Sequence, residues 1–406
     1  MKIFDPQRSK QGSRYKLFIC LTAVIAGWYV FLCLVHLLSG RPLWNDEQCV
    51  FRSVEAYGVR EMFTRDLING QVFPRVYLLG VQMFARLFDL SLVSLRFFSF
   101  AAMMSAFALW LRLAAREFQS RPGYLTFVLS WPASALLIYY SAELKPYSMD
   151  VLAGAVFFAF LSRQGAAEFK RKTLWLVLLP ALGLFSYPAY LFAMIVLYNL
   201  ALEWWRRRRP GHQVLIYAAS LAVFLSISYF FDMRLRHIPY VTGGFSDYFI
   251  SFNSVGDFFK TFQEGTLALF TKWLVIRPRI IKKISTFFLV FGLLYMFYGF
   301  FKIFKKEKGA LRSWTAVAFA LFFELFILGL FKKYPYTVPR TSLFFCPFAL
   351  GLTVKGILHL KGINRHLYRI VHGGYLAFLV FLMLALTRIV CSGKMNFIPV
   401  IFKAVS

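Results

Sequence analysis

The chain has 406 residues, of which 59% are hydrophobic and only 16% are charged, and its formal net charge is +29. A soluble domain of this length could not bury so much apolar surface, which excludes a soluble globular protein. In a soluble protein this charge would suggest a nucleic-acid partner, but basic residues also flank membrane helices on their cytoplasmic side. We therefore predict an all-α polytopic membrane protein, with membrane lipids around it and no nucleic-acid partner.

The hydropathy pattern predicts a bundle of about eleven transmembrane helices, since a span needs about 20 apolar residues. The first follows a basic N-terminal segment and is too long for the core of a signal peptide, so we expect it to stay as an anchor. The predicted helices cover residues 17–38, 92–113, 124–140, 147–162, 173–187, 189–205, 213–231, 286–304, 313–331, 342–360 and 370–390.

Loop charges predict the orientation. With the N-terminus in the cytoplasm, every predicted inside loop is basic, as the positive-inside rule requires. Most acidic residues then fall outside, in two long extracytoplasmic stretches over 39–91 and 232–285. The first carries apolar residues at helical spacing with arginine on other faces, which predicts amphipathic helices at the membrane surface. We expect one transmembrane domain over 1–406, without a soluble catalytic domain.

The first outer stretch begins RPLWNDEQCV, with two adjacent carboxylates, Asp46 and Glu47, just past the first predicted helix. A simple interfacial anchor would account for Arg41. It accounts less well for two acids, because acids are not the usual anchors and the pair repels itself. The pair is a candidate for proton transfer, and a plain polar cluster at the interface remains the alternative.

A second candidate stretch is SAELKPYSMD, residues 141–150. Pro146 suits the first position of a helix that starts at the outer face. The free N–H groups and dipole of that helix start attract an anion, and Lys145 adds a full positive charge beside Glu143. The alternative is an ordinary helix start with a lysine that reaches toward the interface.

The third stretch is KKYPYTVPRTSLFF, residues 332–345, at another outer helix start. Arg340 could bind a phosphate with two parallel hydrogen bonds, whereas tyrosine and basic residues are also common interfacial anchors. The three stretches are far apart in sequence but share one predicted face. Together they offer a candidate base and cationic anion sites at the lipid boundary, which transfer from a membrane-bound phosphate donor requires.

The three stretches, in this order, resemble the polyprenyl-phosphate-dependent GT-C glycosyltransferases, a group that includes protein mannosyltransferases and bacterial lipid A and O-antigen glycosyltransferases. WNDEQCVFRSVEAYG resembles their opening, AELKPYSMD their E-x-R/K-P-Y stretch, and YPYTVPRTSLFFCPFALGL the stretch before a late helix. The resemblance implies a GT-C-type bundle with its active site outside the cytoplasmic (inner) membrane of a bacterium. It implies a polyprenyl-phosphate-linked sugar donor, for which we expect an undecaprenyl carrier, an acceptor lipid or glycan of the cell envelope, and inversion at the anomeric carbon.

Site residues follow from the same resemblance. Asp46 matches the base that the family uses to take a proton from the acceptor hydroxyl. Lys145 and Arg340 are the candidates for holding the leaving phosphate. Tyr147 and Tyr336 are expected to orient phosphate or sugar, and Glu143 to bind substrate.

Two departures from the family pattern concern metal binding. Residues 70–77 read GQVFPRVY where many relatives have His-Pro-Pro, and FSYPAY has Ser186 where many have histidine. His237, with Glu55 or Glu61, is the remaining candidate for a divalent metal, and a lone histidine is usually a surface residue. No cofactor is firmly predicted.

A lipid or glycan transporter, or flippase, is the alternative function. Glu324, in the middle of a predicted helix, would suit an intramembrane charge on a transport path. Against this, the charges gather at one face of the predicted bundle, and the sequence shows no inverted repeat.

Overall fold

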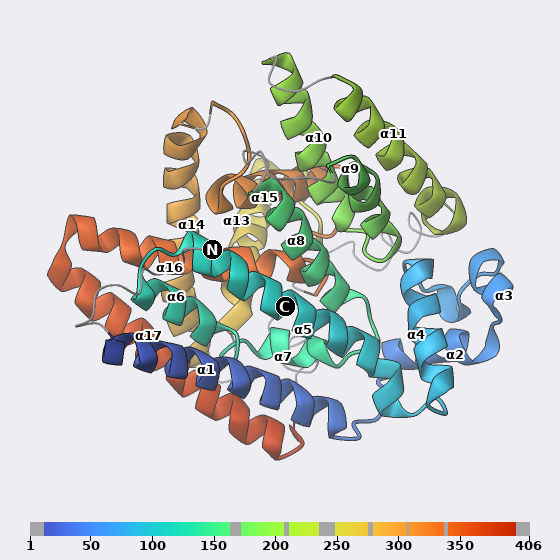
Figure 1. The fold of residues 1–406 in the computed structure, drawn as a ribbon, viewed down its shortest axis with the longest axis horizontal. Coiled ribbons are helices and arrows are strands. Elements are labelled where there is room, and N and C mark those ends of the chain that lie inside the picture. The colour runs from blue at the N-terminus through green and yellow to red at the C-terminus, as the bar shows by residue number, and fades with distance from the viewer. Residues whose placement is uncertain are drawn as a thin grey trace.

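The computed structural model describes residues 12–162, 172–206, 211–234, 248–274, 279–306, 308–336 and 340–394. All regular secondary structure in these ranges is helical (Figure 1). The predicted all-α class is therefore confirmed for the described part of the chain. The helices are α1 (Gly12–Leu38), α2 (Asn45–Ala56), α3 (Val59–Thr64), α4 (Arg75–Leu87), α5 (Leu92–Glu117), α6 (Arg121–Ser130), α7 (Ala135–Ser141), α8 (Tyr147–Leu161), α9 (Lys172–Ala181), α10 (Ala189–Trp205), α11 (Gly211–Ser228), α13 (Val255–Thr271), α14 (Arg279–Lys306), α15 (Trp314–Leu330), α16 (Cys346–Ile363) and α17 (Arg365–Cys391).

Six helical segments are long and apolar enough to cross a membrane, as predicted for a polytopic protein. They are Tyr15–Leu38, Leu92–Glu117, Gly211–Met233, Ile280–Lys306, Leu343–Ile363 and Arg365–Cys391. Four more predicted spans are shorter apolar helices, namely Tyr147–Leu161, Thr173–Leu184, Ala189–Trp205 and Trp314–Leu330. Ten of the predicted spans are therefore recovered as apolar helices, although several are short for a straight crossing.

The predicted helix over 124–140 is wrong at its centre, where the chain turns between α6 and α7. Pro132 lies in this turn, has no N–H to donate and crowds the residue before it. Ser134 then caps α7 by accepting a bond from the Leu137 N–H, and its hydroxyl donates to the Trp273 carbonyl at 2.8 Å. Non-helical backbone at membrane depth is tolerated where protein buries it and satisfies its polar groups, and residues 131–134 are buried.

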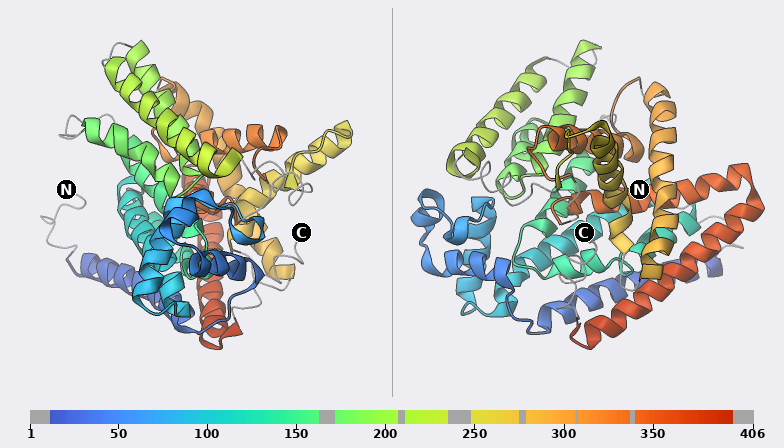
Figure 2. Two further views of the ribbon diagram at one scale, coloured as in Figure 1. Left: turned by 90° about the vertical axis from the view of Figure 1, so that its right-hand side faces the viewer. Right: turned by 180° about the vertical axis from the view of Figure 1, so that it is seen from behind.

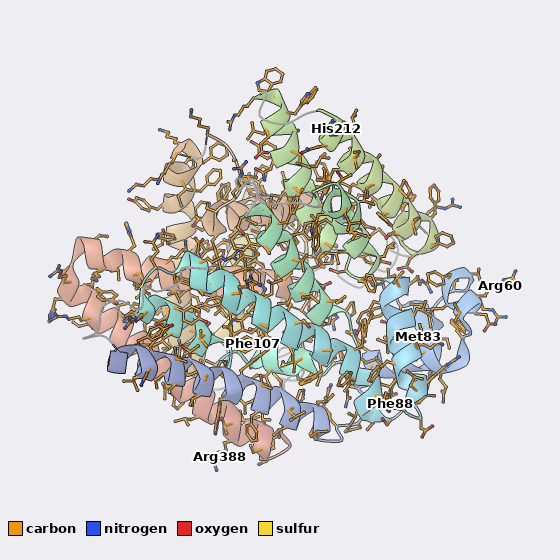
Figure 3. All side chains as sticks on the ribbon, in the orientation of Figure 1. Arg60, Met83, Phe88, Phe107, His212 and Arg388 are labelled. Carbon is orange, nitrogen blue, oxygen red and sulfur yellow. The ribbon has the colours of Figure 1, made fainter. Side chains whose placement is uncertain are left out.

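The first outer stretch folds into a small helical unit of α2, α3 and α4, next to the N-terminal end of α5 (Figure 1). Its own apolar core includes Val50, Tyr77 and Val81. The other side of α4 exposes Met83 (62% exposed), and Phe88 (55% exposed) follows the end of this helix; Figure 3 labels both on the outer unit. An amphipathic unit of this kind suits the boundary between lipid and water, as predicted.

The helix predicted over 286–304 begins earlier in the structure. α14 begins at Arg279 rather than near residue 286, because a helix can extend beyond its apolar part into a basic first turn. Before it, α13 carries exposed Val255 and Phe259 on its first turns. Figure 2 shows α13 extending outward from the body of the molecule.

The bundle core is aromatic and closely packed. Trp110, Phe158, Trp314 and Phe348 contact one another, with ring centroids 4.9 to 5.9 Å apart. These residues come from α5, α8, α15 and α16, so the core joins helices from both halves of the chain. The N-terminal ends of α8 and α16, which carry two of the predicted site stretches, are thereby held in one rigid frame.

Candidate active site

The predicted site residues Asp46, Lys145 and Arg340 meet in space. Asp46 Oδ2 lies 2.7 Å from Lys145 Nζ and 3.1 Å from Arg340 Nη1. The Asp46 side chain is 25% exposed and that of Lys145 only 4%. A carboxylate that can be reached from solvent is therefore held between two cations, one of them almost fully buried.

Three helix ends place these groups. Asp46 lies in the first turn of α2, which is stabilised by a capping interaction between the Trp44 backbone and the Glu47 side chain. Lys145 directly precedes Pro146, the N-cap residue of α8. Arg340 lies a few residues before α16. Asp46 is thus on a helix, whereas Lys145 and Arg340 lie in the segments that lead into α8 and α16.

Lys145 is surrounded by aromatic rings. Its Nζ lies 5.3, 5.6 and 5.9 Å from the ring centroids of Trp44, Phe73 and Tyr147. Ring faces attract a cation within about 6 Å, and more strongly where water is excluded. Tyr147 therefore lies in the site as predicted, and in this structure its ring contacts the ammonium group.

The opposite charges of Asp46 and Lys145 shift the pKa values of both side chains. Burial opposes ionisation of Asp46, but Lys145 and then Arg340 outweigh it and hold the pKa of Asp46 below its usual value. Burial likewise opposes the charge on Lys145, but Tyr147, Asp46 and Glu143 together raise the pKa of its ammonium group. Asp46 is therefore ionised and Lys145 protonated near neutral pH.

Glu47, predicted with Asp46 as a candidate for proton transfer, lies apart from the cavity cations that Asp46 contacts. It is fully buried and makes ion pairs to Arg96 at 2.8 Å and to Arg41 at 3.1 Å, and it accepts the Leu144 N–H at 2.9 Å. Both of its oxygens are occupied by these contacts, so it cannot reach a substrate without breaking them. The structure instead makes Glu47 the link between α2, α5 and the segment before α8.

Glu143 is also fully buried. Its Oε1 accepts the Trp44 Nε1–H at 3.0 Å, and Oε2 has no hydrogen-bond partner among the described residues. Burial raises the pKa of Glu143 to about 7, against the opposing charge of Lys145. This carboxyl group therefore titrates near neutral pH, two residues before the buried lysine.

A cavity of about 300 Å³ lies next to the charged cluster. Its lining combines Lys145, Tyr147 and Arg340 with apolar and aromatic side chains, among them Phe73 and Leu191. A cationic end that continues into an apolar space matches the chemistry of a phosphate carried on a hydrocarbon chain.

One wall of the cavity is fixed by a buried ion pair. Arg75, at the start of α4, donates to Asp232 Oδ1 at 2.8 and 3.1 Å, and Tyr187 donates to the other oxygen of Asp232. Asp232 lies in a π-helical turn at the end of α11. Such turns are frequent at functional sites, and this one ties the outer helical unit to the membrane bundle.

Tyr336, a predicted phosphate ligand, is 1% exposed and its hydroxyl shares a hydrogen bond of 2.9 Å with Thr266. It does not line the cavity. The neighbouring Tyr334 does, and so does Asp150. Both tyrosines lie in the non-helical segment after α15, where the path of the backbone turns Tyr334 toward the cavity and Tyr336 toward Thr266.

The predicted metal candidate His237 lies outside the described residues. Among the residues that the structure describes, no group of three or more His, Cys, Asp or Glu side chains is arranged to hold a metal ion.

Comparison with known proteins gives one distant structural likeness. The chain is similar to ArnT from Cupriavidus metallidurans, solved with bound undecaprenyl phosphate, with a TM-score of 0.48 and 17% sequence identity. The match covers 94% of this chain and 74% of the ArnT chain. No family model and no curated protein matches the sequence.

Proposed function

We propose that this protein is an integral-membrane glycosyltransferase of the GT-C type, which moves a sugar from a polyprenyl-phosphate donor to an acceptor hydroxyl with inversion. The observation that carries the proposal is the meeting of Asp46, Lys145 and Arg340 beside an apolar cavity. A base, two phosphate-binding cations and a space for a hydrocarbon chain are the parts that this reaction needs.

Donor binding changes the partners of Asp46. Without a donor, its carboxylate neutralises part of the charge on Lys145 and Arg340. The donor phosphate is a stronger competitor for both cations, because it offers more oxygens and more charge. As the phosphate binds, Asp46 loses its ion pairs and the influence that lowers its pKa. It then becomes a better base at the moment when a donor is present.

The transfer is a single displacement. The acceptor oxygen attacks the anomeric carbon on the face opposite the phosphate, and Asp46 takes the hydroxyl proton. The bond between the anomeric carbon and the phosphate oxygen breaks, and the electron pair leaves with the polyprenyl phosphate. Lys145 and Arg340 stabilise the charge that develops on that phosphate, while Glu47 holds the start of α2 in place.

The membrane location also belongs to the proposal. The basic predicted inside loops favour a cytoplasmic N-terminus, so that Asp46 faces the periplasm or cell exterior of a bacterium. The acceptor is then a lipid or glycan of the cell envelope. Labelling with a membrane-impermeant maleimide tests this: Asp89→Cys should react in intact cells and Lys306→Cys only after permeabilisation, and the reverse pattern would contradict the orientation.

Replacing Asp46 by Asn tests the catalytic claim. The change keeps the size of the side chain but removes its basicity, so sugar transfer should fall by a factor of roughly 10² to 10⁴, the usual contribution of a general base. Binding of undecaprenyl phosphate should be retained or improved, because the competing carboxylate charge is gone. The measurement is transfer from a polyprenyl-phosphate-linked sugar in membranes, together with carrier binding by the purified protein.

Asp89→Asn is the matched control, because Asp89 is an exposed carboxylate outside the site whose positive φ of 51° asparagine also tolerates. It should leave both measurements unchanged. Normal transfer by the Asp46 variant would remove Asp46 as the base. Movement of the carrier across a bilayer by wild-type protein, without any sugar transfer, would instead favour a flippase.

A further inference from the structure

Asp150 is a buried carboxylate that the proposed mechanism leaves without a role. It lies in the first turn of α8, is 3% exposed, and lines the same cavity as Lys145 and Arg340. Its side chain accepts one hydrogen bond, from the Ser186 hydroxyl to Oδ1 at 2.7 Å. Among the described residues, no lysine or arginine forms an ion pair with it.

Two other buried carboxylates around the site have cationic partners, and a third, Glu143, has one neutral donor but does not line the cavity. Glu47 has two arginines and Asp232 has Arg75 and Tyr187. A buried carboxylate without a cation or a full set of hydrogen bonds is costly. Asp150 has a single neutral donor and faces a space large enough for a ligand. That combination indicates that further donors come from the ligand itself.

We propose that Asp150 and Ser186 recognise the sugar of the donor. The Asp150 carboxylate accepts hydrogen bonds from the hydroxyl groups of this sugar. This inference rests on the proposed function, because it needs the phosphate to be held by Lys145 and Arg340. The Ser186 hydroxyl orients the Asp150 carboxylate and leaves Oδ2 to the sugar.

The donor has three parts, a phosphate, a hydrocarbon chain and a sugar, and their chemistry favours the sugar as the partner of Asp150. A phosphate would be repelled by the Asp150 carboxylate, and a hydrocarbon chain has no group to donate. A sugar offers several hydroxyl donors and is bonded directly to the phosphate. Asp150 is three residues beyond Tyr147 on the same helix, about 4.5 Å along its axis, so it lies near the end of the cavity that Lys145 and Tyr147 line.

The test separates recognition of the sugar from recognition of the carrier. Purified wild-type protein and the Asp150→Asn and Ser186→Ala variants are compared in nanodiscs for binding of undecaprenyl phosphate and of its glucose, mannose, N-acetylglucosamine and arabinose esters. Wild-type protein should bind at least one ester about tenfold more tightly than the bare carrier, the scale of one hydrogen bond to a charged group. Asp150→Asn should abolish this preference, Ser186→Ala should reduce it, and both should leave bare-carrier affinity within about twofold.

Glu324→Gln is the matched control, since Glu324 is another carboxylate within the helical bundle whose Oε2 has no described partner, but it does not line the cavity. It should keep the preference for the ester. The inference is overturned if Asp150→Asn weakens ester and bare carrier equally, if it leaves the preference intact, or if wild-type protein prefers none of the esters. Failure of wild-type protein to bind the bare carrier would instead overturn the proposed function.

Discussion

The adjacent acids at positions 46 and 47 have opposite surroundings, because neighbouring residues on a helix point about 100° apart. Asp46 faces the cavity cations, whereas Glu47 faces the interior and two arginines. The sequence motif locates the pair but does not say which acid is buried, since that depends on partners at positions 41, 96 and 144. In the sequence, Arg96 lies in the middle of an apolar stretch, which is a local indication that it has a buried carboxylate partner.

Glu47→Gln should destabilise the protein. The change leaves Arg41 and Arg96 buried without their counter-charge, which typically costs about 3–5 kcal/mol. Thermal unfolding in detergent should show a clearly lowered Tm. Glu61→Gln is the control, because the Glu61–Arg65 pair is exposed and such pairs contribute at most about 1 kcal/mol. Equal Tm values for the two variants would contradict the linking role of Glu47.

Glu143 should make stability depend on pH. Its pKa is raised by burial from 4.5 to about 7, so between these pH values the unfolded chain has released the proton that the folded protein still holds. The contribution of Glu143 to stability therefore falls as pH rises through this window. The Tm of wild-type protein should drop relative to that of Glu143→Gln between pH 4.5 and 7. A constant difference across the window would contradict this assignment.

At the scale of elements, apolar windows predict most of the helices and tertiary contacts decide their interruptions. The ten recovered spans follow from hydropathy alone. The turn between α6 and α7 does not, because Pro132 breaks the helix only where the surrounding protein satisfies the freed backbone. The early start of α14 is missed for a different reason: the hydrogen bonds of a helix do not require apolar side chains.

The packing of α14 against α16 depends on glycine. A Cβ added at Gly356 would overlap the Phe291 carbonyl oxygen, and one at Gly292 would lie 2.8 Å from the Thr353 nitrogen. Small residues allow this close approach of membrane helices. Gly356→Ala should lower the stability by about 1–3 kcal/mol through overpacking, measured as a fall in Tm. Gly362→Ala, on the same helix with open space around it, is the control, and an equal effect at both positions would contradict the account.

At the scale of the whole molecule, the bundle brings together site residues that are 294 positions apart, Asp46 and Arg340. Loop charges and helix starts predict one shared face for Asp46, Lys145 and Arg340, and the structure brings these three side chains together. The sequence does not predict Tyr334 in place of Tyr336, because both lie in a non-helical turn, nor Asp150, because its position depends on the rotation of the packed helix α8. The charged cluster therefore follows from the sequence more directly than the lining of the cavity does.

The most direct test of the central claim is a cryo-EM structure of the protein with bound undecaprenyl phosphate. The account predicts the phosphate within hydrogen-bond distance of Lys145 Nζ and the Arg340 guanidinium, the hydrocarbon chain entering the cavity, and Asp46 released from at least one of its two ion pairs. A phosphate bound elsewhere, with Asp46 still paired to both cations, would contradict it.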